Sequence, residues 1–417
     1  MSHLSPLLKQ SSRVCADHGQ GSWLYDTDGK AYLDFTSGIG VTSTGHCHPT
    51  VVAAAQEQVG KMIHAQYTTV THRPMLELTD RLVEKMPAGI DSIALSNSGS
   101  EAVEMAMRLA RHATRRANII VFNGGFHGRT MAAASLTTSG TKVRTGFHPM
   151  MAGVVVAPYP HSWRYGWSEE QTTEFCLREL DHILKTQTAP EDTAAILIEP
   201  VQGEYGYYPA NSTFMQGLAE RCKKHGILLI CDEIQAGYGR TGKFWSHQHF
   251  DVQPHILITA KGLASGFPLS AIAASAELMA KGAPGSQGGT YGANAVSCAA
   301  ALATLRVIEQ ENLIENAAAR GTELWDQLHA LQNDYPIIST IRGKGLMLGM
   351  EIGKGPQEPR PDIALRLTEA AEAQGLLLLR CGIDGQIVRW LPPLVVTDEE
   401  VIDAVARFAK ALAEVQP

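Results

Sequence analysis

Two residues that suit one kind of catalysis each end a short apolar segment of this chain. Asp232 follows ILLIC and Lys261 follows ILITA. A lysine amine condenses with an aldehyde, while a carboxylate beside a pyridine nitrogen keeps that nitrogen protonated, so that the ring can accept electrons. Opposite charges within about 4–6 Å also stabilise each other's ionised form. The pair therefore matches what pyridoxal phosphate, an aldehyde on a pyridine ring, needs from a protein.

Each residue alone has an ordinary structural explanation. Asp232 could cap a turn after a strand, and Lys261 could be a solvated charge in a loop. The two residues indicate a cofactor site only if the rest of such a site is present. Such a site also needs a phosphate-binding element and side chains that hold an aromatic ring.

The segment ALSNSGSEAVEMAMRLAR is suited to a phosphate group. It leads from a strand through Ser98, Gly99 and Ser100 into an amphipathic helix with Glu101 in its first turn. Backbone N–H groups and the helix dipole favour an anion at such an N-terminus. A glycine-containing turn before a helix is also common without any ligand. The interpretation of this motif as a phosphate site therefore depends on the presence of Lys261.

Aromatic and aliphatic side chains for the two faces of a ring are also available. Phe126 in NGGFHGRT can stack on a pyridine, and its neighbouring glycines allow close approach of the backbone. Ile234, two residues after Asp232, can pack against the other face. Phe126 could instead be a core aromatic, although glycines on both sides are poor core surroundings.

The order of the elements predicts an α/β fold. Apolar runs alternate with helical patterns, which indicates a mostly parallel central sheet covered by helices. Ligands of such sheets bind beyond the carboxyl ends of the strands. Polar or functional residues follow several runs at that edge: Ser98, Gly99, Phe126, Glu199, Asp232 and Lys261. From about Leu305 the pattern becomes helix, strand (IRGKGLMLGMEI), helix, strand (LLLLRCG) and helix.

We expect a large cofactor-binding domain over 51–304 and a smaller α+β domain over 305–417. The first 50 residues, with a hairpin around Asp28 and Gly29, are expected to pack with the small domain.

Composition excludes several classes of protein. The chain has 417 residues, of which 44% are hydrophobic and 18% charged, and a formal net charge of −7, so there is no basic surface for nucleic acid. We expect no membrane segment or signal peptide, and the seven scattered cysteines suit a cytoplasmic protein with reduced thiols. The cluster His46, Cys47 and His48 raises the alternative of a metal site. Adjacent residues rarely bind one ion, so we expect no metal.

Taken together, the motifs resemble the class III aminotransferases of fold type I, and most closely their 4-aminobutyrate aminotransferase branch. The motifs are ILLICDEIQAGYGRTG, AKGLASGFPLSA, NSGSEAVEMAMRLAR, GGFHGRT, EPVQGE and GGTYGAN, and they run in family order from about Gly38 to Pro393. The resemblance implies a pyridoxal 5′-phosphate enzyme that transfers the amino group of an ω-amino acid to 2-oxoglutarate. It also implies a homodimer whose active site is shared across the interface.

The resemblance also assigns site residues. Lys261 would bind the cofactor aldehyde, Asp232 the pyridine nitrogen and Gln235 the ring hydroxyl. Thr290 would reach the phosphate of the other subunit. The full set of expected cofactor contacts is Ser98, Gly99, Ser100, Phe126, His127, Asp232, Ile234, Gln235, Lys261 and Thr290.

For the substrate, the resemblance implies one arginine that binds the α-carboxylate of glutamate and one glutamate that covers it. These match Arg389 and Glu204, and an arginine fork suits a carboxylate. Arg129 would bind the distal carboxylate, Ile39 would shape the pocket, and Glu199 would also lie at the substrate. Tyr205 stands where the family usually has glycine, so we expect it to narrow the pocket or to alter the cover.

Three alternatives stay open. Phe126 is typical of acetylornithine enzymes, so acetylornithine, ornithine or diamine transamination is the nearest one. Racemisation of an amino acid is another, because related branches catalyse it. A protein that keeps the fold without catalysis is the third, since fold alone does not determine function.

Overall fold

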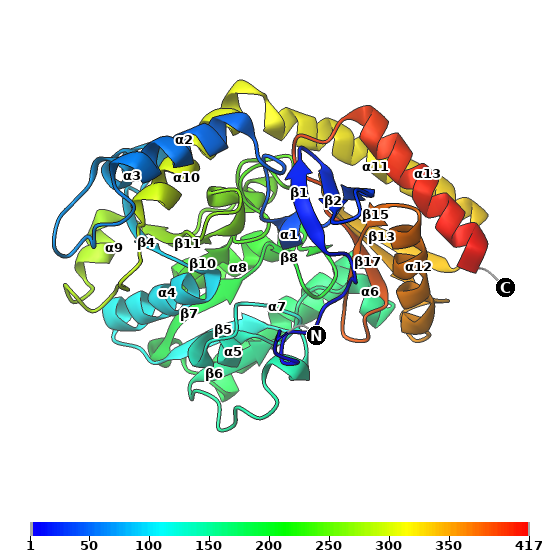
Figure 1. The fold of residues 1–417 in the computed structure, drawn as a ribbon. Coiled ribbons are helices and arrows are strands. Elements are labelled where there is room, and N and C mark those ends of the chain that lie inside the picture. The colour runs from blue at the N-terminus through cyan, green and yellow to red at the C-terminus, as the bar shows by residue number, and fades with distance from the viewer. Residues whose placement is uncertain (1–2, 416–417) are drawn as a thin grey trace.

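A seven-stranded sheet forms the centre of the computed structural model, which describes residues 3–415 (Figure 1). Its strands, in spatial order, are β4 (Ser92–Ser96), β12 (Ser270–Ala274), β11 (Ile256–Thr259), β10 (Leu228–Asp232), β7 (Thr193–Ile198), β5 (Asn118–Phe122) and β6 (Val154–Ala157). The five strands from β11 to β6 are parallel, and β12 is antiparallel to both of its neighbours. The predicted mostly parallel sheet is therefore confirmed.

Strand β7 explains why the central strands are continuous apolar runs. All six of its residues are buried. Ala195 and Leu197 belong to the core cluster of helix α4 (Gly99–Thr114), while Ile196 and Ile198 belong to the cluster of α7 (Glu169–Thr186) and α8 (Ser212–His225). Side chains alternate between the faces of a strand, and here helices cover both faces. The sheet is thus held rigidly between two layers.

The apolar runs from which the sheet is predicted do not include strand β12. Its sequence, SAIAA, is rich in alanine, which has a low β propensity, so the run gives a weak signal. The strand is nevertheless completely buried between β11 and β4. Its position in the interior of the sheet, rather than its composition, keeps it extended.

Segments from the N-terminal and C-terminal parts of the chain meet in a second, four-stranded sheet. Its strands are β1 (Ala16–Gln20), β2 (Trp23–Asp26), β3 (Ala31–Asp34) and β15 (Leu376–Leu377), and β15 runs parallel to β3. The hairpin between β2 and β3 is confirmed, since Gly29 N–H donates to the carbonyl of Asp26 at 3.0 Å with a φ of 82° at Gly29. The domain boundaries at residues 50 and 304 stay predictions.

A third sheet is antiparallel and carries the C-terminal helices. It comprises β13 (Ile338–Lys344), β14 (Met347–Ile352), β17 (Ile387–Trp390) and β16 (Leu379–Cys381), with helices α11 (Leu313–Asp334), α12 (Pro361–Ala373) and α13 (Asp398–Val415). The single strand expected over IRGKGLMLGMEI is wrong. That segment is a hairpin of β13 and β14, which turns at Gly345 with a φ of 53°. The apolar residues continue directly after the turn and hide it in the sequence.

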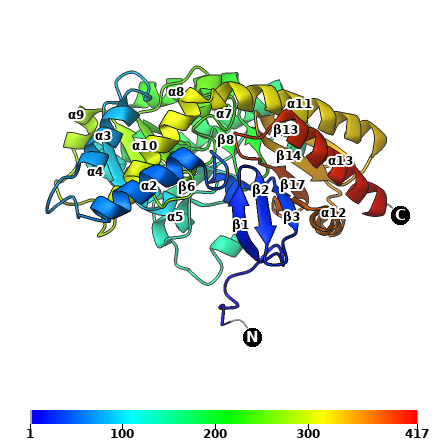
Figure 2. The same cartoon turned by 45° about the horizontal axis from the view of Figure 1, so that its top comes forward.

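Two consecutive helices connect the region of the seven-stranded sheet with the C-terminal helices. Figure 2 shows α10 (Ala295–Gln310) and α11 following one another along one side of the molecule, from the seven-stranded sheet to the C-terminal helices. Within residues 3–415, no helix is long and apolar enough to cross a membrane. The seven cysteines are free thiols, five of them buried.

Candidate active site

A cavity of about 480 Å³ lies at the carboxyl ends of the parallel strands, within the range of small-ligand pockets. It is lined by most of the predicted residues: Ser98, Gly99, Ser100, Phe126, His127, Asp232, Ile234, Gln235, Lys261, Ile39, Arg129, Glu199 and Glu204. A larger hollow of about 980 Å³ lies at the other ends of the strands, around Leu228 and His255. It contains none of the predicted residues, so the smaller cavity is the candidate active site.

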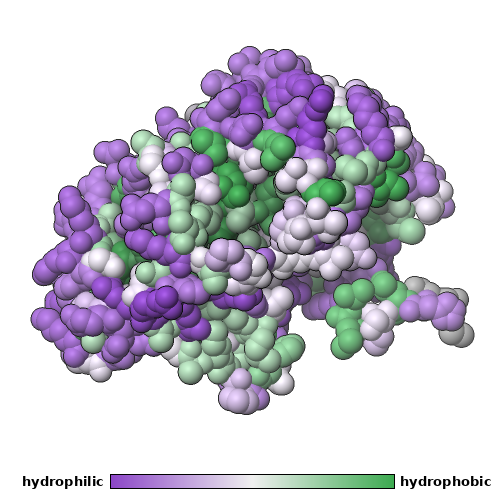
Figure 3. All heavy atoms as spheres, turned by 90° about the vertical axis from the view of Figure 1, so that its left-hand side faces the viewer, coloured by the Kyte–Doolittle hydropathy of each residue, from purple (hydrophilic) through white to green (hydrophobic). Residues whose placement is uncertain are grey.

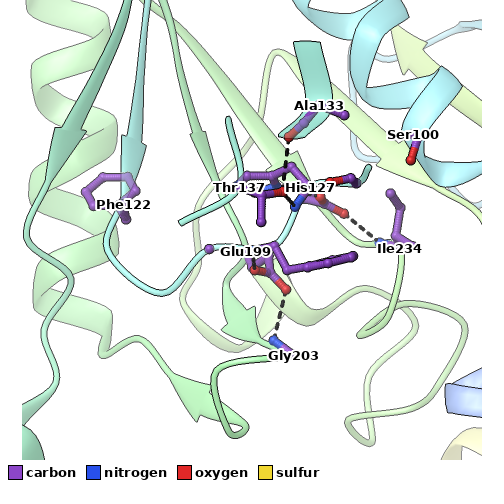
Figure 4. Close-up of polar contacts among 12 residues, drawn as sticks. Ser100, Phe122, His127, Ala133, Thr137, Glu199, Gly203 and Ile234 are labelled. Carbon is purple, nitrogen blue, oxygen red and sulfur yellow. Dashed lines mark hydrogen bonds and ion pairs between the residues drawn. The ribbon is translucent and has the colours of Figure 1, made fainter. Parts of the chain in front are cut away.

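Asp232 is the last residue of β10 and is held at both carboxylate oxygens. His127 Nδ1 lies 2.8 Å from Oδ2, and the N–H of Ile234 donates to Oδ1 at 3.1 Å. An ionised carboxylate only accepts, so His127 is the donor of this pair. Both side chains are almost completely buried. His127 is itself fixed through its N–H, which donates to the Thr137 hydroxyl at 2.9 Å (Figure 4). This arrangement sets the direction of the carboxylate.

Lys261 follows β11, the strand next to β10. Its φ of 43° is left-handed, an unusual backbone for a residue with a side chain and one that gathers at functional sites. Burial lowers the pKa of its amine to about 8, although the carboxylates of Asp232 and Glu199 act in the opposite direction. A lysine of this kind is partly neutral near physiological pH, and a neutral amine can act as nucleophile and as general base.

The N-terminus of α4 forms the end of the cavity that suits a phosphate. A capping box closes it, in which the Ser98 hydroxyl accepts from the N–H of Glu101 and the Glu101 carboxylate accepts from the N–H of Ser98. Gly99 and Ser100 occupy the first turn, where helices have N–H groups without intrahelical acceptors. A Cβ on Gly99 would lie 3.0 Å from Ile234 Cδ1, so glycine lets the helix approach the ring-binding wall closely.

The remaining polar and apolar groups fit pyridoxal phosphate. Gln235 Oε1 is buried and has no hydrogen-bond partner among the described atoms, so it is available to accept from a ring hydroxyl. Phe126 and Ile234 both line the cavity and offer apolar surface for a planar ring. Asp232 would hold the pyridine nitrogen, Lys261 the aldehyde, and the first turn of α4 the phosphate. The donor set therefore matches every functional group of this cofactor.

Glu199 connects two loops of the site. One carboxylate oxygen accepts from the N–H of Phe126 at 2.8 Å and the other from the N–H of Gly203 at 2.9 Å (Figure 4). Burial raises the pKa of Glu199 to about 7, while His127 and the two N–H donors act to lower it. The residue thus fixes the loop that carries Phe126 relative to the loop that leads to Glu204.

Arg389 and Glu204 form an ion pair at the wall of the cavity. Arg389 Nη1 lies 2.9 Å from Glu204 Oε2, and its Nη2 donates to the carbonyl of Arg380 at 3.0 Å. Arg389 lies on β17 and is 5% exposed, while the Glu204 side chain is 40% exposed. Glu204 lines the cavity and Arg389 does not. The glutamate therefore stands between the arginine and the cavity.

Arg129 and Ile39 lie at the outer part of the cavity. The Arg129 guanidinium lies 5.9 Å from the centre of the Phe126 ring, and its backbone N–H donates to the Ser100 hydroxyl at 3.1 Å. Ile39 is 45% exposed and has a φ of 68°, which a β-branched residue rarely adopts. Such a strained turn beside a cavity is a further sign of a functional position.

Thr290 is the one predicted cofactor contact that does not line the cavity of its own chain. It is exposed, and its carbonyl accepts from His64 Nε2 at 2.7 Å. Conversely, the cavity contains residues that the sequence analysis left out: Gly38, Val41, Asn97, Gly128, Ala260, Gly266, Phe267, Pro268 and Leu269. Most of them are direct neighbours of the motifs in the chain, and this adjacency is the signal that could have found them.

The cluster around Cys47 does not form a metal site. His46 Nε2 lies 2.8 Å from Asp34, and His48 Nε2 lies 3.0 Å from a different carboxylate, that of Glu311. Over residues 3–415, no three His, Cys, Asp or Glu side chains come together in a way that could hold a metal ion.

Comparison with known proteins agrees with this geometry. The family model of the class III aminotransferases matches residues 8–412. The 5-aminovalerate aminotransferase DavT of Pseudomonas aeruginosa is 38% identical, with 96% of this chain and 94% of the relative covered. The 4-aminobutyrate aminotransferase GabT of Escherichia coli is 40% identical, with coverages of 93% and 91%.

A solved structure confirms the fold. An amine transaminase from an uncultivated Pseudomonas species, in its pyridoxal phosphate-bound form, superposes with a TM-score of 0.92 at 28% identity, covering 100% of this chain and 98% of the other. The predicted fold type I architecture and cofactor are therefore correct. The chain belongs to the class III aminotransferases and is a pyridoxal phosphate-dependent aminotransferase.

Proposed function

We propose that this aminotransferase takes the amino group from an ω-amino acid with a four- or five-carbon chain and gives it to 2-oxoglutarate. The observation that carries the proposal is the ion pair of Arg389 and Glu204 at the cavity wall. An ω-amino acid has one carboxylate, which Arg129 would bind. Glutamate and 2-oxoglutarate have a second carboxylate, which Arg389 would bind after Glu204 moves away. One cavity would thus serve two substrates.

The reaction would divide between the cofactor and the residues of the cavity. When bound, pyridoxal phosphate supplies an electron sink for the substrate carbon that loses its proton. Asp232, oriented by His127, would keep the pyridine nitrogen protonated. Lys261 Nζ would take the proton from the carbon that bears the amino group, since its lowered pKa of about 8 suits a general base at neutral pH. Phe126 and Ile234 would keep the ring in place.

Two relatives support the choice of amine. DavT is named for 5-aminovalerate and GabT for 4-aminobutyrate, and each covers more than nine tenths of this chain. Both compounds carry their amine at the end opposite to the carboxylate. The separation between Arg129 and Lys261 would then select chain length.

A homodimer and a cytoplasmic location complete the proposal. Thr290 lies outside the cavity of its own chain. In a homodimer it would instead reach the phosphate in the cavity of the other subunit. Apolar side chains are exposed directly after Thr290, at Tyr291, and in the segment 63–76, at Ile63, Val70 and Leu76. Figure 3 looks at the face that carries α3 (Arg73–Val83) and α9 (Ala276–Ala280), where apolar atoms gather in a hollow. Free cysteines suit a reducing compartment.

Acetylornithine or ornithine is the second candidate amine, because Phe126 takes the stacking position. A diamine or a racemised amino acid belongs to the same set of alternatives. All of them would use Lys261 and Asp232 in the same way, so the difference lies only in what the outer cavity admits.

A substrate screen tests the proposal. The holoenzyme is given 4-aminobutyrate, 5-aminovalerate, β-alanine, ornithine, N-acetylornithine or putrescine, each with 2-oxoglutarate or pyruvate. We expect the highest kcat/KM for an ω-amino acid with 2-oxoglutarate. Chiral analysis of the products detects racemisation. A cofactor-loaded enzyme that shows no absorbance change near about 400–430 nm with any ω-amino acid would rule the proposal out.

A further inference from the structure

The glutamate that covers Arg389 lies at the tip of a short hairpin. Strands β8 (Val201–Gln202) and β9 (Tyr208–Pro209) pair antiparallel, and the N–H of Gly206 donates to the carbonyl of Gly203 at 3.1 Å. The carbonyl of Glu204 accepts from the N–H of Gly382 at 3.1 Å. The backbone of Glu204 is therefore held on the side of the C-terminal sheet, while its carboxylate reaches Arg389.

Tyr205, the next residue, does not line the cavity, so the expectation that its side chain narrows the pocket is wrong. It is 6% exposed, and its ring centre lies 4.8 Å from that of His161. Its hydroxyl accepts from Arg164 Nη1 at 2.8 Å. A Cβ on Gly124, whose φ is 85°, would lie 2.7 Å from Tyr205 Cγ. The ring is thus enclosed between the hairpin, the segment around His161 and the loop that leads to Phe126.

A second contact joins the same three segments. Gln202 Nε2 donates to the carbonyl of Asn123 at 2.9 Å, and Gln202 Oε1 lies 2.7 Å from His161 Nε2. Gln202 holds the base of the hairpin, whereas Tyr205 holds its tip. On the side of the large sheet, the Tyr205 ring therefore restrains the backbone after Glu204, while the hydrogen bond from the N–H of Gly203 to Glu199 restrains the backbone before it.

This restraint has a consequence for a substrate with two carboxylates. Such a substrate must displace the Glu204 carboxylate from Arg389. If the tip of the hairpin could move, Glu204 could retreat together with its backbone. Because the Tyr205 ring is packed on several sides, Glu204 must instead leave by rotating its side chain about a backbone that stays in place. The open state is then less populated than in a chain with a small residue at position 205.

We propose that Tyr205 is a positioning residue that keeps the Arg389–Glu204 gate biased toward its closed state and so weakens the binding of dicarboxylates relative to monocarboxylates. The proposal rests on the proposed function, because it takes Glu204 to be the cover of Arg389. It concerns the selectivity between the two half-reactions, and it assigns this selectivity to a residue that touches neither substrate nor cofactor.

Calorimetric binding of two unreactive acids to the holoenzyme tests the proposal. Glutarate and valerate have five carbons each and differ by one carboxylate, so only glutarate needs Arg389. In Tyr205→Ala, we expect glutarate to bind about five- to tenfold more tightly, because the apparent Kd falls as the open fraction rises. Valerate should bind as it does to the unchanged protein. An unchanged Kd for glutarate, or an equal change for both acids, would overturn the proposal.

Three further variants separate the gate from general loosening. Tyr205→Phe keeps the packed ring and loses only the contact with Arg164, so it should change the Kd of glutarate less than about twofold. In a Glu204→Ala background, Tyr205→Ala should have no further effect on glutarate, since coupled residues act non-additively. A gain that persists there contradicts the gate. If Tyr205→Ala does not fold, Tyr205→Leu fills much of the same space and should give a smaller increase in glutarate affinity. An unchanged affinity in Tyr205→Leu would also overturn the proposal.

The two proposals can fail separately. Glutarate and valerate bind without turnover, so the calorimetric result does not depend on which amine the enzyme uses. A substrate screen that favours acetylornithine would end the proposed function and leave the Tyr205 effect in place. Equal behaviour of the two acids in Tyr205→Ala would end the Tyr205 proposal even if 4-aminobutyrate were the best amine.

Discussion

The two halves of the cavity are built in opposite ways. On the cofactor side, Asp232 is 3% exposed, ends a central strand and has both carboxylate oxygens hydrogen-bonded. On the carboxylate side, Arg389 comes from the C-terminal sheet, and its contact with the cavity is blocked by a Glu204 side chain that is 40% exposed. The first half is fixed by the strands of one sheet. The second half is assembled from two sheets and closed by one side chain.

This difference follows from what each half has to bind. The cofactor side meets the same ring in both half-reactions, so preorganised groups serve it best. Under the proposed function, the carboxylate side must accept an amine with one carboxylate and a keto acid with two. A cover that can leave Arg389 solves this, because a buried arginine without a partner is costly. The comparison predicts that changes on the cofactor side harm both half-reactions equally, and that changes on the carboxylate side harm one of them.

The largest loss should come from Lys261→Ala, on the cofactor side. In the proposed mechanism Lys261 is both the amine that binds the aldehyde and the general base, so kcat should fall by at least about 10⁴-fold in both half-reactions. Single-turnover absorbance measurements with 4-aminobutyrate and, separately, with 2-oxoglutarate on the pyridoxamine form follow each half.

Lys344→Ala is the matched control for that loss. Burial also lowers the pKa of Lys344, yet this residue lies outside the cavity. Its activity should stay within about twofold of the unchanged enzyme, because substitutions away from the site have small effects. Substantial residual turnover in Lys261→Ala would break the view that one lysine serves both half-reactions.

How much of the molecule the sequence predicted also differs between the halves. Asp232 ends one strand of strong apolar character and Lys261 closely follows another, so their positions and their meeting at one sheet edge followed from chemistry and strand order. The contact of His127 with Asp232 did not, because it joins residues 105 positions apart and leaves no local pattern. The alanine-rich β12 and the turn at Gly345 were missed because their local signals are weak.

On the carboxylate side, the sequence alone gave less. Arg389 and Glu204 were assigned through a family resemblance and not through spacing, since nothing local links a residue of β17 to a hairpin 185 positions earlier. Tyr205 shows the limit most clearly. Its position in the chain, next to Glu204, suggested a pocket residue, while packing against Gly124 and His161 turns it away from the cavity.

Arg389→Ala should give the next largest effect and should be selective. Losing the partner of a substrate carboxylate costs about 2–5 kcal/mol, so kcat/KM for glutamate should fall by about 10²-fold. Monoamines without an α-carboxylate should be spared, because they do not need Arg389. Steady-state kinetics with glutamate and with a simple monoamine compare the two. Equal losses for both would show that Arg389 supports the whole cavity and does not recognise one substrate.

A smaller and unselective effect is expected for His127→Leu. It removes the donor to Asp232, and a hydrogen bond to a charged group is worth about 1.5–3 kcal/mol; at the lower end of this range kcat should fall by about tenfold. His127→Asn places an amide donor near the former Nδ1 and should recover part of the loss. Rapid-mixing kinetics should show the same loss in both half-reactions. A loss confined to the dicarboxylate half would contradict the assignment of His127 to the cofactor side.

The smallest expected effect is a shift in pH dependence, which compares the two halves electrostatically. The amine of Lys261 must be neutral to attack an aldehyde, and burial lowers its pKa to about 8. The rate at which cofactor-free enzyme recombines with pyridoxal phosphate should therefore rise about tenfold per pH unit below pH 8 and become constant above it. A lysine with its ordinary pKa would show a rate that keeps rising to about pH 10.

Carboxylates near Lys261 raise its pKa, Asp232 more strongly than Glu204. Removing a negative charge favours the neutral amine, so the constant region should begin at lower pH in Asp232→Asn and move less in Glu204→Gln. Absorbance followed between about pH 6 and 10 measures both shifts. A larger shift in Glu204→Gln than in Asp232→Asn would mean that the gate, and not the fixed carboxylate, sets the charge state of the lysine. The charge of Lys261 and the state of the Arg389–Glu204 gate would then be coupled. The selectivity between monocarboxylates and dicarboxylates would in that case also change with pH.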